Sequence, residues 1–199
     1  MAHVAPGPGE QYLIRRKVFK ILGNAFHVYG AGGGLVAYCK QKAFKLREDM
    51  RFYTDESEAN ELFSMKARSI LDFSTTYDVR LPTGESLGSL RRKGFKSMLR
   101  DEWAIFAPES EGEQQIGRII EDSAGLAIAR RLLGDWGGML PQRFRIEDAG
   151  GRAIATYRTS FNPFIYKLGV TIHEKDERFD DLLILAAGCL LAAIEGRQN

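Results

Sequence analysis

The sequence predicts a mainly β protein in which about twelve antiparallel strands close into a barrel threaded by a C-terminal hydrophobic helix. Two observations carry this prediction. A cation-x-apolar triplet occurs four times between alternating runs, at spacings of 25, 26 and 25 residues, beginning at Lys17, Lys42, Arg68 and Lys93. Near the end of the chain, residues 182–194 contain no polar side chain. Period-two alternation indicates half-buried strands, so the repeat is a β-hairpin, and an entirely apolar helix needs burial on every side.

The first four hairpins share one pattern. Each consists of a strand, a corner with the cationic triplet, a second strand, and a turn that is rich in glycine or acidic residues. The expected strand pairs are residues 12–18 with 25–29, 35–41 with 50–54, 61–68 with 76–81, and 86–92 with 102–107.

The fifth hairpin has a long insert in place of its corner. Its strands are expected at residues 115–121 and 142–147, and within the insert residues 123–133 have the serine cap and apolar face of a short helix. Residues 153–158 and 166–172 form the sixth hairpin. A single open sheet of twelve strands would expose two edges, so closure into a barrel is the economical arrangement.

The last segment is expected to be the plug of that barrel. Asp180 is a good helix N-cap, and Asp181 suits the positive end of a helix. A thirteen-residue apolar helix is about 20 Å long, whereas a bilayer core is about 30 Å thick, so we expect no transmembrane span. The predicted organisation is a flexible tail over residues 1–10 and one domain over residues 11–199, with its central helix at about 180–195.

Composition argues against several functional classes. The chain of 199 residues has a net charge of +2 and is 44% hydrophobic, which is ample for a core but does not demand a nucleic-acid partner. Two cysteines, Cys39 and Cys189, make no disulfide framework, so a cytoplasmic location is expected. The three histidines lack ligand spacing, so we expect no metal, and no cofactor is predicted.

Two short strings resemble functional motifs but lie in expected turns. Residues 84–88 match G-x-S-x-G, which activates a serine only between a buried strand and a helix, and here a turn precedes it and a strand follows. Residues 30–34 are rich in glycine but lack the remaining residues of a phosphate-binding loop. We therefore expect no catalytic residues and no enzymatic activity.

The repeated cations are the candidate binding residues. Equivalent positions of successive hairpins fall at equivalent heights on a closed barrel, so like charges there would form an arc suited to phosphate groups. The alternative is that each cation marks a strand end and points into water. The candidate lipid- or phosphate-binding residues are Lys17, Lys42, Arg68, Lys93, Arg15, Arg16, Arg91 and Arg92.

The hairpins and the segment from Phe179 to Glu195 resemble the superfamily of Tubby C-terminal domains, LURP-one-related proteins and phospholipid scramblases. The resemblance covers residues 11–197, is closest to small LURP-one-like and scramblase-like members, and implies a Tubby-like twelve-stranded barrel around a central helix. Tubby domains bind phosphoinositide headgroups, and scramblases are linked to calcium and lipid movement. The scramblase calcium segment corresponds to residues 174–181 here, where Lys175 and Arg178 interrupt the acids, so calcium binding is not expected.

Together, these observations favour a non-enzymatic β-barrel module that binds anionic lipid headgroups or phosphoinositides at a membrane surface. Its expected location is cytoplasmic and peripheral to the inner face of the membrane. The alternative is a protein-interaction or regulatory scaffold that uses exposed aromatic residues such as Trp136 and Phe144. A second alternative is scramblase-like lipid transfer.

Overall fold

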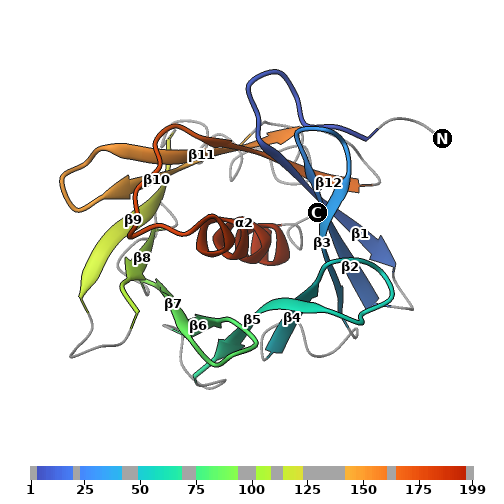
Figure 1. Cartoon of the computed structure of the whole chain (residues 1–199). Coiled ribbons are helices and arrows are strands. Elements are labelled where there is room, and N and C mark those ends of the chain that lie inside the picture. Colours follow the sequence, from blue (N-terminus) through green and yellow to red (C-terminus); the bar gives the residue numbers. More distant parts are fainter. Residues whose placement is uncertain are drawn as a thin grey trace.

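The structure, a computed structural model, describes residues 4–19, 23–41, 49–68, 75–93, 102–108, 114–122, 142–160 and 165–195. Within these residues, twelve antiparallel strands form a closed barrel around one helix (Figure 1). The strands are β1 (Tyr12–Phe19), β2 (Gly23–Gly30), β3 (Leu35–Gln41), β4 (Asp49–Tyr53), β5 (Glu61–Ala67), β6 (Thr76–Arg80), β7 (Ser86–Arg92), β8 (Glu102–Phe106), β9 (Gln115–Glu121), β10 (Arg143–Asp148), β11 (Ala153–Ser160) and β12 (Ile165–Ile172). The predicted fold class is therefore confirmed.

Each strand pairs with its neighbours in the chain, and β1 pairs with β12 to close the barrel. Closure leaves no long sheet edge exposed, which is the reason a sheet of this size curls. The predicted insert helix at residues 123–133 and the cation Lys42 lie outside the described residues.

The string that matches a catalytic serine motif occupies a turn and the start of β7. Gly84 has a φ of 90°, which favours glycine, and the turn is closed by a hydrogen bond from the Leu81 amide to the Glu85 carbonyl, 2.8 Å long. Ser86 then begins β7. The serine therefore lies at the start of a strand and not between a strand and a helix.

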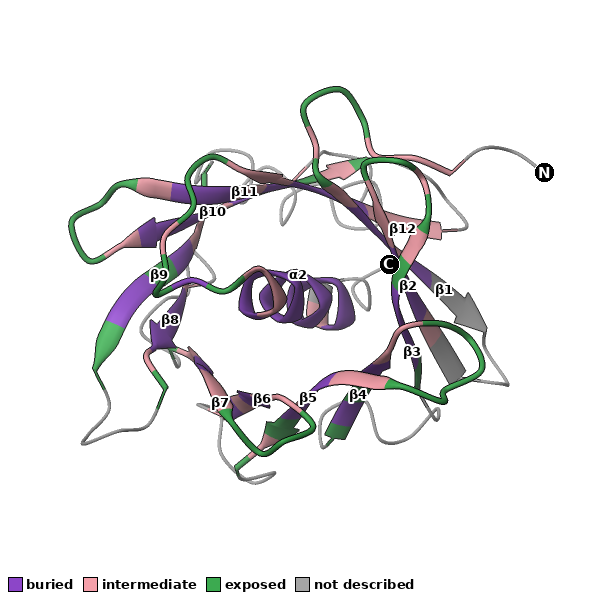
Figure 2. Cartoon of the chain, viewed as in Figure 1, coloured by how far each residue is buried: buried purple, intermediate pink, exposed green. Residues whose placement is uncertain are grey.

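The helix α2 (Asp181–Glu195) runs through the centre of the barrel, and every residue from Leu183 to Ala193 is buried (Figure 2). The Asp180 carboxylate accepts a hydrogen bond of 2.7 Å from the Leu182 amide, so the predicted N-cap is confirmed. Burial of a helix on all sides requires apolar residues on every face, and the sequence of α2 meets this requirement.

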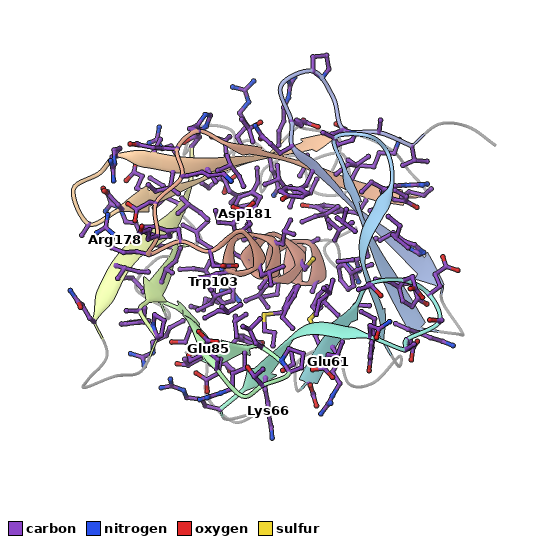
Figure 3. The ribbon with its side chains drawn as sticks, in the orientation of Figure 1. Glu61, Lys66, Glu85, Trp103, Arg178 and Asp181 are labelled. Atoms are coloured by element: carbon purple, nitrogen blue, oxygen red, sulfur yellow. The ribbon has the colours of Figure 1, made fainter. Side chains whose placement is uncertain are left out.

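The strands pack their inward side chains directly on α2. Phe52 and Phe63 stack with their ring centroids 4.4 Å apart, and Trp103 points toward the helix (Figure 3). Gly188 lies at a close approach, because a Cβ there would be 2.6 Å from Ile14 Cδ1 and 2.9 Å from Tyr157 Cε1. The barrel interior is thus filled by protein, and the outer face remains for binding.

Candidate anion-binding surface

Three of the four repeated cations, all except Lys42, are within the described residues and lie at one end of the barrel. Lys17 is near the end of β1, Arg68 directly follows β5, and Lys93 directly follows β7. Odd-numbered strands of this barrel all run in the same direction, so their ends share one rim. Strands are about 4.8 Å apart, which puts cations two strands apart at about 10 Å from each other along the rim.

Two of these rim cations have acidic partners of their own. Arg68 Nη2 lies 2.7 Å from Asp78 Oδ1, and Arg68 Nε donates to the same carboxylate at 2.9 Å. Lys93 Nζ lies 2.6 Å from Glu102 Oε1. Each pair joins the two strands of one hairpin across its corner, so the acids offset the charge that these rim cations would present to a ligand.

Arg91 and Arg92 are also engaged by neighbouring strands. Arg91 Nε donates to Thr76 Oγ1 at 2.8 Å, and its guanidinium lies 4.7 Å from the centroid of the Phe106 ring. The Arg92 guanidinium lies 6.0 Å from the centroid of the Trp103 ring. These contacts tie both cations to side chains of β6 and β8.

Arg16 is inside the barrel, with 2% of its surface exposed. Its Nη1 donates a hydrogen bond of 2.8 Å to the carbonyl of Ala192, near the C-terminal end of α2. The last turn of α2 has no basic residue, so Arg16 supplies the positive charge that favours the negative end of a helix. Arg16, a candidate lipid-binding residue in the sequence, is therefore buried and stabilises the contact between β1 and α2.

Arg15 is on the outer face of β1. It is directly opposite Lys167 of β12, and its guanidinium lies 5.8 Å from the centroid of the Tyr29 ring. The buried Nε of Arg15 has no hydrogen-bond partner among the described residues. Among the predicted residues whose side chains the structure describes, Arg15 is partly exposed and forms no ion pair with a described residue.

The cross-strand register extends this positive charge over four strands. Arg158 of β11 is opposite Gly169, two residues from Lys167 on the same face of β12, and Arg143 of β10 is directly opposite Arg158. Diagonal neighbours on one face are about 7–8 Å apart, and direct neighbours are closer. We call Arg143, Arg158, Lys167 and Arg15 the basic band.

One carboxylate lies within the basic band, that of Glu10 over Gly169, between Lys167 and Arg158. In the described part of the chain, Arg143, Arg158 and Lys167 form no ion pair and no side-chain hydrogen bond, although Arg145 beside them pairs with Glu147 at 2.7 Å. Like charges directly opposite each other destabilise a sheet, so an external anion would relieve this repulsion. These three residues are not predictable as a group from the sequence, because only the register between distant strands brings them together.

A hollow of about 390 Å³ lies beside this band on the outer face of β10, β11 and β12. Arg143 and Arg158 line it, together with polar side chains that include Thr156 and His173. A volume above about 300 Å³ is in the range of small-molecule sites. The outer wall therefore has both a charged strip and a concave site.

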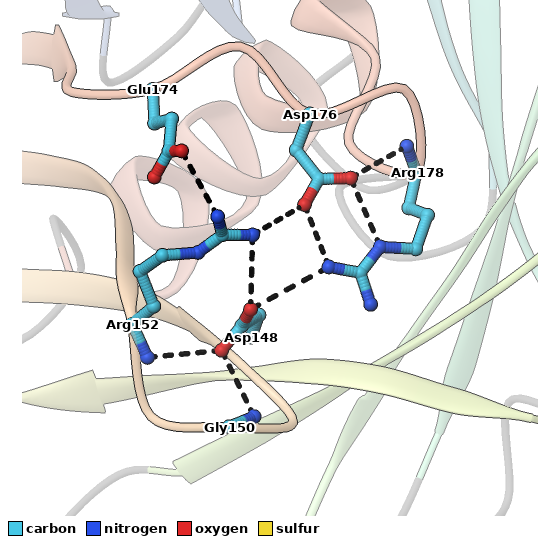
Figure 4. A network of polar contacts seen from close by, with 6 residues as sticks. All are labelled: Asp148, Gly150, Arg152, Glu174, Asp176 and Arg178. Carbon is cyan, nitrogen blue, oxygen red and sulfur yellow. Dashed lines mark hydrogen bonds and ion pairs between the residues drawn. The ribbon is translucent and has the colours of Figure 1, made fainter.

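The acidic segment before α2 is held by arginines, in an arrangement that we call the clasp: Asp148, Arg152, Glu174, Asp176 and Arg178 (Figure 4). Arg178 Nη2 lies 2.6 Å from Asp176 Oδ2, and Arg152 Nη2 lies 2.9 Å from the same oxygen. The hydrogen bonds from Arg178 hold the pKa of Asp176 well below its usual range, and the Arg152 amide lowers the pKa of Asp148.

The carboxylates of the clasp are thus already bound by positive groups. No group of three or more His, Cys, Asp or Glu in the described residues could hold a metal ion. No helix in the described part of the chain is long and apolar enough to cross a membrane.

Comparison with family models finds a match to the LURP-one-related family over residues 35–191. The chain belongs to this family, which is part of the Tubby-like superfamily, so the resemblance seen in the sequence is confirmed. A search of curated proteins finds no match. The family and its barrel fold support a non-enzymatic barrel module.

Proposed function

We propose that this barrel contacts anionic lipid headgroups, including phosphoinositides, through the basic band on its outer face. The observation that carries the proposal is the direct opposition of Arg15 and Lys167 across β1 and β12, next to Arg158 and Arg143. Four cations on adjacent strands match a surface of many negative charges better than they match one small neutral ligand. The proposed location is cytoplasmic, at the inner face of the membrane, because that leaflet carries the anionic lipids.

The filled interior supports binding on the outside. A lipocalin-like carrier holds its ligand within the barrel, whereas here α2 occupies the centre and Gly188 is within contact distance of β1 and β11 side chains. A lipid headgroup therefore has to approach the outer wall.

The described surface offers a ligand charged contacts and few apolar ones. Among the described residues, Val36 is the only large hydrophobic side chain classed as exposed, at 38%. Phe144 is 1% exposed, so the expectation that it is available to a protein partner is wrong, because its side chain packs in the barrel core. Trp136 lies outside the described residues.

The expected affinity is modest and depends on salt. Each Lys or Arg near an anionic membrane contributes about 1 kcal/mol, so four contribute roughly 4 kcal/mol before ordering costs. Exposed charges are screened beyond about 8 Å at physiological ionic strength. Binding by the basic band should therefore weaken steeply as salt is added.

Co-sedimentation with vesicles tests the proposal. Full-length protein should bind vesicles of phosphatidylcholine with phosphatidylserine or a phosphoinositide, bind poorly to phosphatidylcholine alone, and be released by salt. Lys167→Gln should weaken binding about fivefold, since roughly 1 kcal/mol is lost. Lys66→Gln removes an exposed charge from β5 and should have little effect.

Two results would contradict the proposal. Equal binding to neutral and anionic vesicles would exclude the charged band as the contact. Absence of binding to every vesicle would instead favour the protein-interaction scaffold.

A further inference from the structure

We infer that residues 7–11, which we call the strap, hold the basic band in an autoinhibited state, with the Glu10 carboxylate in the place of an external anion. The inference rests on the proposed function, since it assigns a form of regulation to the same surface. The strap precedes β1 and lies along the outer face of β12 (Figure 1). An anionic surface therefore has to displace the strap before it reaches the whole band.

Gln11 fixes one end of the strap to β12. Its amide donates a hydrogen bond of 2.9 Å to the Val170 carbonyl, and its side-chain Oε1 accepts one of 2.8 Å from the Ile172 amide. Both bonds involve Gln11 itself, so they persist when the residues before it move. Gln11 is therefore the pivot of the strap.

Glu10 lies on the barrel wall between two cations of the basic band. Its carboxylate occupies the space above Gly169, where even a Cβ would overlap it. Gly169 is opposite Arg158 and two residues from Lys167 on the same face of β12. Opposed residues have Cα atoms about 5 Å apart, and alternate residues of one strand are about 7 Å apart. Both spacings are shorter than the Debye length of about 8 Å, so the Glu10 carboxylate lowers the positive potential that an external anion meets.

The strap also covers the wall physically. Leu13 faces outward from β1, directly opposite Gly169, and yet it is 8% exposed. The wall is therefore covered at this point, beside the position of the strap. Pro8 and Glu10 of the strap also line the hollow that Arg158 lines. A membrane, which is nearly flat on this scale, meets the strap before it meets the wall.

Few contacts oppose the release of Glu10. Its carboxylate accepts a hydrogen bond of 2.8 Å from the Gly7 amide, and its own amide donates one of 3.0 Å to the Gly7 carbonyl. Both bonds lie within the strap and move with it. In the described part of the chain, the Glu10 carboxylate forms no ion pair with the barrel. A ligand with several negative charges can therefore replace the single charge of Glu10 while few contacts are broken.

Two variants of the full-length protein open the strap in different ways. Glu10→Gln removes the charge of the carboxylate, whereas Gly169→Ala keeps every charge and places a methyl group where the carboxylate lies. Glu85→Gln is the control for the first variant, since Glu85 is exposed in the turn between β6 and β7, across the ring of strands from β12. Gly34→Ala is the control for the second, because nothing lies within 4 Å of a Cβ at Gly34.

Co-sedimentation with phosphatidylcholine vesicles that contain phosphatidylserine measures the effect. A protein that binds only in its open state has an affinity reduced by the fraction that is open. Glu10→Gln should bind about fivefold more tightly than the wild type, because one charge that repels the membrane is removed. Gly169→Ala should also bind more tightly, and both controls should bind as the wild type does.

The double variant Glu10→Gln/Gly169→Ala separates displacement of the strap from a simple change of charge. Its gain in affinity should be smaller than the product of the two single gains, because both changes open the same strap. A gain in Glu10→Gln that Gly169→Ala does not share would overturn the inference, since charge alone would then account for it.

A soluble anion separates this inference from the proposed function. Inorganic triphosphate carries several negative charges, so calorimetric titration with it tests the band without a membrane. Tighter triphosphate binding by both variants, without vesicle binding by any of the proteins, would support the strap and contradict the membrane function. Vesicle binding that is equal in the wild type and both variants would overturn the strap and leave the membrane function standing. No binding of either probe by any of the proteins would overturn both.

Discussion

Arg15 and Arg16 are adjacent in β1 and have opposite surroundings. Arg16 points into the barrel and donates to the Ala192 carbonyl, whereas Arg15 is on the outer face opposite Lys167. The sequence alone predicts a surface position for both, because an arginine at an inward position of a strand breaks the alternation of apolar and polar residues that marks the buried face. The apolar neighbour Ile14, fully buried, shares the inward face and was the available signal.

Substitution of each arginine by methionine tests this difference. Arg16→Met should lower the free energy of unfolding by about 1–3 kcal/mol, because the buried carbonyl of Ala192 loses its donor. Arg15→Met should change it by no more than about 0.5 kcal/mol. Urea denaturation measures both, and equal losses would contradict the assigned faces.

The two cysteines are buried thiols. Burial raises the pKa of Cys39 to about 12 and raises that of Cys189 well above its usual value. Since the thiolate is the reactive form, neither should react with Ellman's reagent at pH 8 in the native protein. Both should react in denaturant, and rapid labelling of the native protein would contradict the packing of α2, which carries Cys189.

At the scale of elements, three features hold α2 in the barrel. They are the N-cap at Asp180, the close packing of Gly188 against the strands, and the clasp. The cap and the apolar faces were predictable from the sequence, because an N-cap acts locally and apolar residues recur around the whole helix. The clasp was not predictable from the sequence, because its ion pair between Arg152 and Asp176 joins the turn after β10 to the segment before α2. Such contacts depend on how distant segments pack.

A substitution at Gly188 tests how closely α2 packs against the strands. Gly188→Leu should overpack the site beside Ile14 and Tyr157 and cost about 1–3 kcal/mol or more. Gly34→Leu is the control, because nothing lies within 4 Å of a Cβ at Gly34. Thermal melting of both variants measures the difference, and a Gly188→Leu protein as stable as the wild type would contradict a tightly filled barrel.

The clasp makes the stability of the folded protein depend on pH in the acidic range. The pKa values of Asp148 and Asp176 are lowered from 3.8 in the folded protein, so the unfolded chain binds protons first as the pH falls. Their stabilising effect is complete well above pH 3.8 and is lost at lower pH.

Asp176→Asn should therefore melt below the wild type at neutral pH, and the gap should narrow as the pH falls below about 3.8. Glu174→Gln is the control, since the Glu174 side chain is 47% exposed and makes one ion pair with Arg152. A gap between wild type and Asp176→Asn that stays constant with pH would contradict an ionised Asp176 as the source of the stability.

At the scale of the whole molecule, the barrel followed from alternation and turns, but the binding surface did not. Repeat positions placed Arg68 and Lys93 on one rim, yet Asp78 and Glu102, each on the second strand of the same hairpin, neutralise them. Those acids were visible in the sequence, ten and nine residues downstream. The basic band arises from register across β10, β11, β12 and β1, including the closure of the barrel, which no local pattern encodes.

The most direct test of the basic band compares two double variants that each remove two positive charges. Arg15→Gln/Lys167→Gln should weaken binding to anionic vesicles about 10- to 30-fold, because about 2 kcal/mol is lost. Arg68→Gln/Lys93→Gln should stay within about threefold of the wild type, because those cations are already paired with acids. Equal losses, or a larger loss in the second variant, would contradict the account and place the contact at the rim.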